Sequence, residues 1–349
     1  MNHEILFDAT FRNNQTGIGQ DAKVVFLKLG GSFNTKYYSP KLFERLDFVD
    51  LRKLTNLVSL VTPIYFRMSS ANKGIFYQPQ VSSLVAGKNI GAWIIRIHDI
   101  FPITNPEWYP WKSRVLFKRN FNRAVRLGAI FLCSSEFARN SILKLYPELK
   151  GRIAISFCEP REIKTELCQD CAGCDRLSFL SDRKFVLAVG TIEPRKNYQG
   201  LIEVWRGFSR VHKDINLVIV GAPGWKTRRI QKRLRNSMGI NIFWLPRTCD
   251  GSLNELYSRC LAYLSTSFEE GFNLPALEAR ALYRKPLVLS NIEVHREFHS
   301  GSALFFENPN QLVGIFHSTL REPQGWQPDK IEGNLNLLEL ITSLSSRTT

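Results

Sequence analysis

Four charged residues have the types and spacing to handle a phosphorylated ligand. Arg195 and Lys196 follow an apolar run and precede a helical pattern that Asn197 can cap. Two cations beside free backbone N–H groups bind phosphate through charge-assisted hydrogen bonds. Glu270 and Glu278 flank a second helix start in a Glu-x7-Glu pattern. No Asp-x-Asp pair occurs in the sequence, so we expect the cations, and no bound metal, to neutralise a diphosphate.

The stretch 268–281 (FEEGFNLPALEARA) contains both glutamates. We expect Asn273 to cap the helix through its side-chain oxygen and Pro275 to lie in the first turn, where its missing N–H has no helical partner. The apolar run 261–266 predicts a strand that leads into this loop. A strand that delivers a loop to a helix N-terminus is a common anion-binding arrangement in α/β proteins.

Two further candidates lie in the first half of the chain. Gly17, Ile18 and Gly19 are predicted to end a polar loop after a strand at 4–9, where glycines allow close approach of the backbone to a ligand. An ordinary turn is equally consistent with them. His98 directly follows the predicted strand 92–97. It is a candidate ligand-contacting residue, or else a histidine bonded to a loop carbonyl.

Strands alternate with helical patterns through most of the chain, which predicts mainly parallel sheets. The predicted strands lie at 4–9, 57–61, 74–77, 92–97, 129–133, 152–157, 185–189, 217–220, 240–245, 261–266, 286–290 and 303–306. Ser252 and Glu255 form an apparent capping box before one of the later helices. The charged, cysteine-rich segment 159–182 breaks the alternation. We therefore predict two doubly wound α/β domains, with the interdomain linker in that segment.

The span 108–127 (WYPWKSRVLFKRNFNRAVRL) predicts an amphipathic helix with tryptophans at its start. At helical periodicity Lys112, Arg119, Arg123 and Arg126 share one face, and Phe117, Phe121 and Ala124 lie opposite. A basic stripe beside aromatic residues suits a bilayer interface. The alternative is a surface helix whose phenylalanines enter the core.

Composition bounds the function classes. The chain has 349 residues, 44% of them hydrophobic, and a net charge of +16, which favours a polyanionic partner such as nucleic acid or an anionic bilayer. Neither a leader nor a membrane-spanning run is evident. Cys158, Cys168, Cys171 and Cys174 have spacing that a metal can use, but reduced linker thiols are the simpler interpretation.

Taken in order, these motifs resemble the retaining glycosyltransferases of family four, which have two Rossmann-like domains in the GT-B architecture with an interdomain cleft. The resemblance rests on TGIG at 16–19, HDIFPITNPEWY at 98–109, SSEF at 134–137, GTIEPRKN at 190–197, VIVGAPGW at 218–225 and EEGFNLPALEA at 269–279. The chain departs from the family pattern at Gln20-Asp21, at Cys158-Glu159-Pro160 and at Tyr283-Arg284-Lys285.

The resemblance implies a role for each candidate. Glu278 holds the donor ribose, Glu270 stands near the transferred sugar, and Arg195 and Lys196 stabilise the leaving diphosphate. His98 approaches the donor sugar. The implied donor-binding set is Gly190, Arg195, Lys196, Gly271, Phe272, Asn273, Leu274 and Glu278, and the implied acceptor side is Gly17, Ile18 and Gly19. The leaving phosphate itself is thought to act as base in this family.

We therefore expect a metal-independent, retaining hexosyltransferase without a cofactor, with GDP-mannose as the first donor and UDP- or dTDP-sugars as alternatives. The expected acceptor is a saccharide or a polyprenyl-diphosphate-linked saccharide of surface polysaccharide assembly, including lipopolysaccharide. We expect a cytoplasmic protein, peripheral on an anionic membrane face, and no nucleic-acid partner. The rivals are a non-catalytic nucleic-acid- or membrane-binding protein and a degenerate transferase kept as a scaffold.

The expected domain boundaries follow from the same patterns. Residues 1–160 form the acceptor-side domain, 161–182 the linker and 183–318 the donor domain. Residues 319–349 form a tail, for which a helix that returns to the first domain is one option.

Overall fold

The computed structural model describes residues 4–8, 17–38, 64–66, 74–82, 84–86, 90–161, 163, 177, 180, 182–237, 241–246, 248–319 and 339. By its internal contacts the chain divides into two compact units. The first comprises Met1–Glu159 and Glu332–Thr349, and the second comprises Pro160–Ile331.

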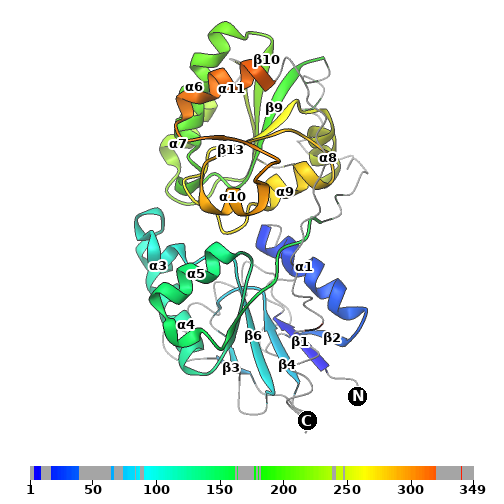
Figure 1. The fold of residues 1–349 in the computed structure, drawn as a ribbon, viewed down its shortest axis with the longest axis vertical. Helices are drawn as coiled ribbons and strands as arrows, with labels where there is room; N and C mark the ends of the chain where they lie inside the picture. The colour runs from blue at the N-terminus through cyan, green and yellow to red at the C-terminus, as the bar shows by residue number, and fades with distance from the viewer. Residues whose placement is uncertain are drawn as a thin grey trace. The chain divides into compact units, whose positions relative to one another are not determined.

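The first unit is built on a six-stranded parallel sheet in the order β2-β1-β4-β6-β7-β8 (Figure 1). Its strands are β1 Glu4–Asp8, β2 Asn34–Tyr38, β4 Ile75–Gln78, β6 Ala92–Ile97, β7 Ile130–Cys133 and β8 Ile153–Ile155, and a separate parallel pair joins β3 Ile64–Phe66 to β5 Leu84–Ala86. Strands β4 and β6 are buried along their whole length. Burial on both faces explains their continuous apolar sequence.

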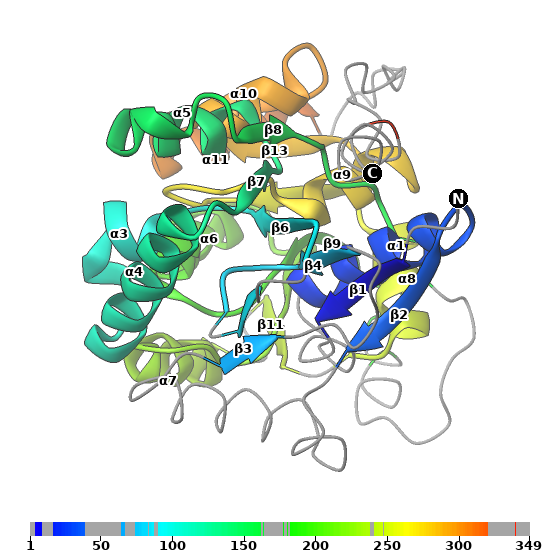
Figure 2. The same cartoon turned by 90° about the horizontal axis from the view of Figure 1, so that it is seen from below.

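Helices cover both faces of this sheet, with α1 on one side and α4 and α5 on the other (Figures 1 and 2). They are α1 Gly17–Gly30, α3 Phe101–Thr104, α4 Trp111–Arg126 and α5 Glu136–Leu145. On the α1 face Val25 and Leu29 pack with Phe7 of β1. On the other face Phe121 of α4 and Ile142 of α5 are fully buried.

The second unit has another six-stranded parallel sheet, in the order β11-β10-β9-β12-β13-β14. Its strands are β9 Lys184–Val189, β10 Ile215–Val220, β11 Ile242–Leu245, β12 Ala262–Ser265, β13 Leu287–Ser290 and β14 Leu304–Phe306. Numbered along the unit, this order is 3-2-1-4-5-6, the arrangement of a dinucleotide-type doubly wound fold.

Its helices are α6 Tyr198–Val211, α7 Arg228–Ser237, α8 Asp250–Arg259, α9 Leu274–Ala281, α10 Glu293–His299 and α11 Leu312–Thr319. One core places Trp205 and Phe208 of α6 and Leu234 of α7 against the sheet. The opposite core contains Leu256 and Tyr257 of α8. The chain is therefore an α/β protein with two doubly wound, Rossmann-like units, as the sequence predicts.

Two local predictions are wrong. Residues Gly17–Gly19 belong to the first turn of α1 and do not form a loop, because a helix start leaves N–H groups unpaired anyway and tolerates glycine there. Ser252 and Glu255 do not form a capping box, because α8 already begins at Asp250, where the Cys249 side chain accepts from the Ser252 N–H at 3.3 Å.

Three predictions fall outside the described residues: the strand at 57–61, the cysteines at 168, 171 and 174, and, apart from residue 339, the tail beyond 319. Among the described helices, none combines the length and apolarity needed to cross a bilayer.

Candidate functional site

The predicted phosphate-binding residues follow two neighbouring strands of the second sheet. Strand β9 pairs with β10 on one side and with β12 on the other, so the order of strands reverses at β9. The loop after β9 leads to the short 3₁₀ turn Pro194–Lys196, and the loop after β12 leads to α9. In doubly wound sheets this reversal point is where ligands bind.

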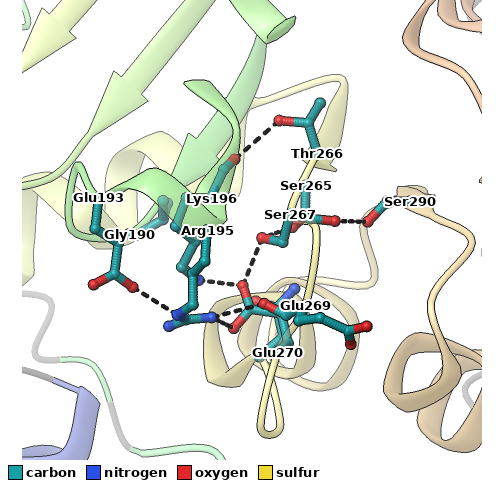
Figure 3. Close-up of polar contacts among 12 residues, drawn as sticks. Gly190, Glu193, Arg195, Lys196, Ser265, Thr266, Ser267, Glu269, Glu270 and Ser290 are labelled. Atoms are coloured by element: carbon teal, nitrogen blue, oxygen red, sulfur yellow. Dashed lines mark hydrogen bonds and ion pairs between the residues drawn. The ribbon is translucent and has the colours of Figure 1, made fainter. Parts of the chain in front are cut away.

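Arg195 and Lys196 converge on one carboxylate, that of Glu270 (Figure 3). The Arg195 Nε also donates to Glu193 at 2.8 Å, and its Nη1 donates to the carbonyl of Glu269 at 3.0 Å. The two loops are therefore joined by ion pairs and a backbone contact, which fixes both cations before any ligand arrives.

Glu270 is buried and accepts three hydrogen bonds from protein groups. The Ser267 hydroxyl donates to its Oε1 at 2.6 Å, in addition to the two cations (Figure 3). Burial alone would raise the pKa of Glu270, but the charges of Arg195 and Lys196 outweigh burial and hold the pKa well below its usual range. Glu270 is thus an ionised anchor for both cations. Its expected position near the transferred sugar stays a prediction.

Glycines allow the loop after β9 and the loop after β10 to contact each other. Gly190 has a positive φ of 154°, and a Cβ there would lie 3.3 Å from the Lys196 Nζ, so the lysine lies over the glycine. A Cβ on Gly221, which follows β10, would lie 1.9 Å from the Gly190 carbonyl oxygen. That carbonyl also accepts from the Tyr198 hydroxyl at 2.8 Å. The loop after β9 is therefore held by backbone packing as well as by ion pairs.

The segment before α9 has the predicted boundaries, but its cap works differently. Asn273 is the N-cap residue at φ 71°, and its side chain makes no capping bond. The amide lies instead 2.8 Å from the Nε2 of His295, and its oxygen accepts from Tyr263 at 3.3 Å. Phe272 packs on Phe298 with ring centroids 4.3 Å apart. These contacts anchor the loop to β12 and α10.

Glu278 lies in α9, as predicted, and is bonded on both oxygens. Arg161 Nε donates to Oε1 and the Tyr257 hydroxyl donates to Oε2, each at 3.0 Å. Arg161 also donates to Asp250 at 2.8 Å. Burial raises the pKa of Glu278, and the Arg161 charge opposes that shift.

In the first unit, His98 follows β6 and belongs to a buried polar cluster. Arg96 donates to Asp21 of α1 at 3.1 Å and to the Cys158 thiol at 3.2 Å. The His98 Nε2 lies 3.6 Å from Asp21, and its Nδ1 lies 3.9 Å from Cys158. Burial lowers the pKa of His98 to about 4, so the ring is neutral at pH 7.

This cluster joins two of the positions that depart from the family pattern. Asp21 and Cys158 are both bonded to Arg96, and no local sequence pattern connects the three residues. The ligand atoms of Asp21, His98 and Cys158 lie within 4.8 Å of one another, a spacing that a metal can use. The guanidinium of Arg96 already neutralises the charge of Asp21 at that place.

The predicted donor-binding residues all belong to the second unit, as does Glu270, the carboxylate predicted near the sugar. The donor-binding set is Gly190, Arg195, Lys196, Gly271, Phe272, Asn273, Leu274 and Glu278. His98, Gly17, Ile18 and Gly19 belong to the first unit. Sequence reasoning missed Glu193, Ser267, Tyr257 and Arg161. Glu193 and Ser267 lie within the motif loops and could have been proposed from proximity. Arg161 is separated from Glu278 by 117 positions, and no local pattern connects them.

The amino-acid sequence is similar to those of known glycosyltransferases. Residues 175–313, which contain the whole cation site, match the family described as Glycosyl transferases group 1. The serotype-specific mannosyltransferase WbdA of Escherichia coli is 37% identical over 260 residues, which cover 67% of this chain and 30% of that protein. The O-antigen chain mannosyltransferase B of E. coli is 27% identical over 239 residues, 66% of this chain and 61% of that protein. The chain thus spans about a third of the length of WbdA.

Solved structures match the fold. Sucrose-phosphate synthase from Thermosynechococcus elongatus aligns with a TM-score of 0.64 at 13% identity, over 100% of this chain and 94% of that one. WaaG, a glycosyltransferase involved in lipopolysaccharide biosynthesis, aligns with a TM-score of 0.59 at 12% identity, over 99% and 93%. With the motifs, the family match and two Rossmann-like units in agreement, residues 175–313 belong to the group 1 glycosyltransferases, and the chain has the GT-B fold of the matching structures.

Proposed function

We propose that the chain transfers mannose from GDP-mannose to a saccharide or lipid-linked saccharide in the assembly of a surface polysaccharide. The observation that carries this proposal is the pair of cations, Arg195 and Lys196, fixed at the reversal point of the second sheet. Preorganised cations stabilise charge that develops on a leaving diphosphate. The names of the related E. coli proteins favour mannose, and UDP- and dTDP-sugars are the alternative donors.

Retention of anomeric configuration is part of the proposal. Glu270 is the carboxylate nearest the cations, and its oxygens already accept from Arg195, Lys196 and Ser267. A carboxylate held in this way is a poor nucleophile, which favours a front-face transfer over a covalent enzyme intermediate. Proton NMR of the first product should show the α anomer from α-linked GDP-mannose; the β anomer would contradict retention.

Metal independence is supported by the two cations. Arg195 and Lys196, whose charges Glu193 and Glu270 balance in the free protein, offer N–H donors that would bind the diphosphate oxygens in place of a divalent ion. Transfer should therefore continue at an unchanged rate in EDTA. A rate that falls in EDTA and returns with Mg²⁺ or Mn²⁺ would overturn this part of the proposal.

The donor is best identified with a thermal-shift panel of GDP-, UDP- and dTDP-sugars. A ligand at ~100 times its dissociation constant adds about 2.7 kcal/mol of stability. GDP-mannose should therefore raise Tm by several degrees. Lys196→Ala should lose most of that shift, whereas Lys28→Ala, which removes an ion pair with Glu159 in the first unit, should keep it. No shift with any of the three classes would contradict the transferase.

We also propose peripheral attachment to an anionic cytoplasmic membrane face through α4. Trp111 and Val115 are 66% and 55% exposed, and Lys112, Arg114 and Lys118 are exposed beside them. The exposed face is thus displaced from the predicted stripe, since Arg119 and Arg123 are half-buried. Apolar side chains among cations suit the headgroup region of a bilayer.

Vesicle pelleting tests this attachment. The protein should pellet with vesicles containing anionic lipid, less so as salt rises. Charge reversal of Arg114 and Lys118 to Glu should abolish pelleting. The matched reversal of Arg229 and Lys232 to Glu, on the exposed face of α7, should not. Equal losses from both pairs would show that total charge, and not α4, governs attachment.

A further inference from the structure

Glu278 accepts two hydrogen bonds from protein groups, one on each oxygen. A carboxylate offers about two acceptor sites per oxygen. Arg161 Nε uses one site on Oε1, and the Tyr257 hydroxyl uses one on Oε2. The geometry therefore leaves one acceptor site on each oxygen, which matches two adjacent hydroxyl groups such as those of a ribose.

The charge of Glu278 is essential to that match. An ionised carboxylate only accepts, whereas a protonated carboxyl must donate one hydrogen. Burial favours the protonated form, and Arg161 is the cation that opposes burial most strongly. The other titratable groups that face Glu278 are the hydroxyls of Tyr257, Tyr263 and Tyr283 and the carboxylate of Asp250, and the negative charge of Asp250 favours protonation. Arg161 is thus the basic group on which the ionised form depends.

Arg161 is itself held in place. Its Nη1 donates to Asp250, the first residue of α8, at 2.8 Å, while its Nε donates to Glu278 of α9 at 3.0 Å. Asp250 and Tyr257 lie on the same helix, so α8 supplies the group that fixes Arg161 and also the second donor to Glu278. The side chain of Arg161 is 14% exposed, which leaves the ion pair weakly screened by solvent.

We propose that Arg161 is a positioning residue for the donor nucleotide: it holds Glu278 ionised and oriented, with one acceptor site on each oxygen directed to the ribose hydroxyls. This inference rests on the proposed function, because it requires a nucleoside diphosphate as ligand. Asp250 serves the same end by fixing Arg161. Neither residue needs to touch the reacting atoms.

The test is calorimetric titration of the whole chain with GDP or UDP, whichever the wild type binds, at pH 6 and pH 8.5. Arg161→Met should weaken binding at least tenfold at pH 6 and clearly less at pH 8.5, because without the cation Glu278 becomes protonated at a higher pH. The terminal phosphate of the nucleotide titrates with a pKa of about 6, and comparing variants at the same pH cancels that contribution.

The ribose provides a second readout. The wild type should prefer the ribonucleotide to its 2′,3′-dideoxy analogue by at least tenfold, and Arg161→Met should reduce that preference toward unity at pH 6. In a Glu278→Gln background, Arg161→Met should change affinity little, because the group through which it acts is gone. Arg161→Lys, which keeps the charge, should restore part of the loss.

Two variants guard against a general effect on folding. Arg259→Met removes an ion pair with Glu255 on the same helix α8 and should bind as the wild type does. Asp250→Asn keeps Arg161 but loosens it, and should give a smaller loss of affinity and of the preference for the ribonucleotide, with a weaker pH dependence, because it also removes a negative charge that favours protonation of Glu278. Asp250→Asn replaces Arg161→Met in the test if Arg161→Met does not fold.

The outcomes separate the inference from the proposed function. Wild-type chain that binds no nucleoside diphosphate overturns both. The role of Arg161 is overturned if Arg161→Met binds the nucleotide as tightly as the wild type or more tightly. It is also overturned if the variant loses the same affinity at both pH values and for both nucleotides. Either result leaves the transferase proposal standing.

Discussion

Each unit of the molecule contains a cluster in which arginine or lysine meets a buried carboxylate, and the two clusters differ in access. In the first unit Arg96 is 1% exposed and pairs with Asp21. In the second, Arg195 and Lys196 are 15% and 10% exposed and share Glu270. The first cluster is closed, so its cation stabilises the interior. In the second cluster Arg195 and Lys196 balance the charges of Glu193 and Glu270 and are partly exposed to solvent, so these cations can meet a ligand.

The same contrast explains why ion pairs alone do not identify a ligand site. A buried pair contributes little net stability, but removing one partner leaves an uncompensated charge. Lys196 lies over Gly190 at the reversal point of its sheet, whereas Arg96 points from β6 toward α1 and Cys158. Position relative to the sheet, together with access, distinguishes the two clusters.

The largest expected effect tests the closed cluster. Arg96→Met should lower the free energy of unfolding by about 3–5 kcal/mol, because Asp21 remains buried without its cation. The double variant with Asp21→Asn should recover part of that loss. Arg139→Met, which removes an exposed pair with Glu136, should cost less than about 1 kcal/mol in the same urea titration. Equal costs for Arg96 and Arg139 would show that the first cluster is not closed.

A substitution in the second cluster should lower the rate of sugar transfer. Lys196→Ala should lower kcat/KM for sugar transfer on the order of 10²–10³-fold, the usual cost of losing one preorganised group that stabilises transition-state charge. Initial rates with saturating acceptor measure this loss. A variant with near wild-type kcat/KM would break the comparison, because both clusters would then be structural.

Acid should weaken both units through buried histidines, His98 in the first unit and His295 and His299 in the second, because burial lowers the pKa of each. Burial lowers the pKa of His98 and of His295 to about 4, below the unfolded value of about 6.5. Between pH 6.5 and 4 the unfolded chain binds protons that the folded chain does not, so stability falls as pH falls, by up to about 3 kcal/mol per histidine. Above pH 6.5 none of these histidines contributes a slope. Glu278, with a raised pKa, acts in the opposite sense.

Urea unfolding at pH 7 and pH 5 measures this slope. His98→Asn and His295→Asn should each flatten it, and both together should flatten it further. A slope that neither variant changes would assign the acid sensitivity to other groups.

Substitutions at two helix caps should have the smallest effects on stability, and the two losses should differ in size. The Ser135 hydroxyl accepts from the Ala138 N–H at 3.0 Å, and the Asn197 side chain accepts from Gly200 at 3.2 Å. Ser135→Ala should cost about 1 kcal/mol, whereas Asn197→Gly should cost only a few tenths, because glycine adopts the φ of 52° at that position without strain. Thermal unfolding compares the two. A larger loss from Asn197→Gly would mean that the side chain, and not its backbone conformation, governs this cap.

Buried parallel strands were predictable because they are continuous apolar runs. Strands β6 and β12 lie within the predicted ranges to about one residue, and Asn197 was recognised as a cap from its position before an amphipathic helix. The glycines at 17 and 19 were misread as a loop because glycine is a turn signal on its own. Only packing against the sheet shows that α1 begins there.

The long-range partners could not be predicted. Arg96 stands in an apolar strand, and its partner Asp21 lies 75 positions away. Arg161, which lies outside both helices, meets Glu278 of α9 while it also bonds Asp250 at the start of α8. Charge and spacing within a motif predict where a ligand would bind, whereas the groups that fix the charge of that motif come from the tertiary fold.

The contact between Gly221 and Gly190 has a consequence for engineering donor choice. A Cβ at residue 221 would lie 1.9 Å from the carbonyl oxygen of Gly190, so any side chain there must displace the loop that carries both cations. Ala222 and Pro223, the next two residues, are exposed. A library meant to alter sugar specificity can therefore randomise residues 222 and 223 while keeping 221 fixed, and most of its members should still fold with the cation site assembled.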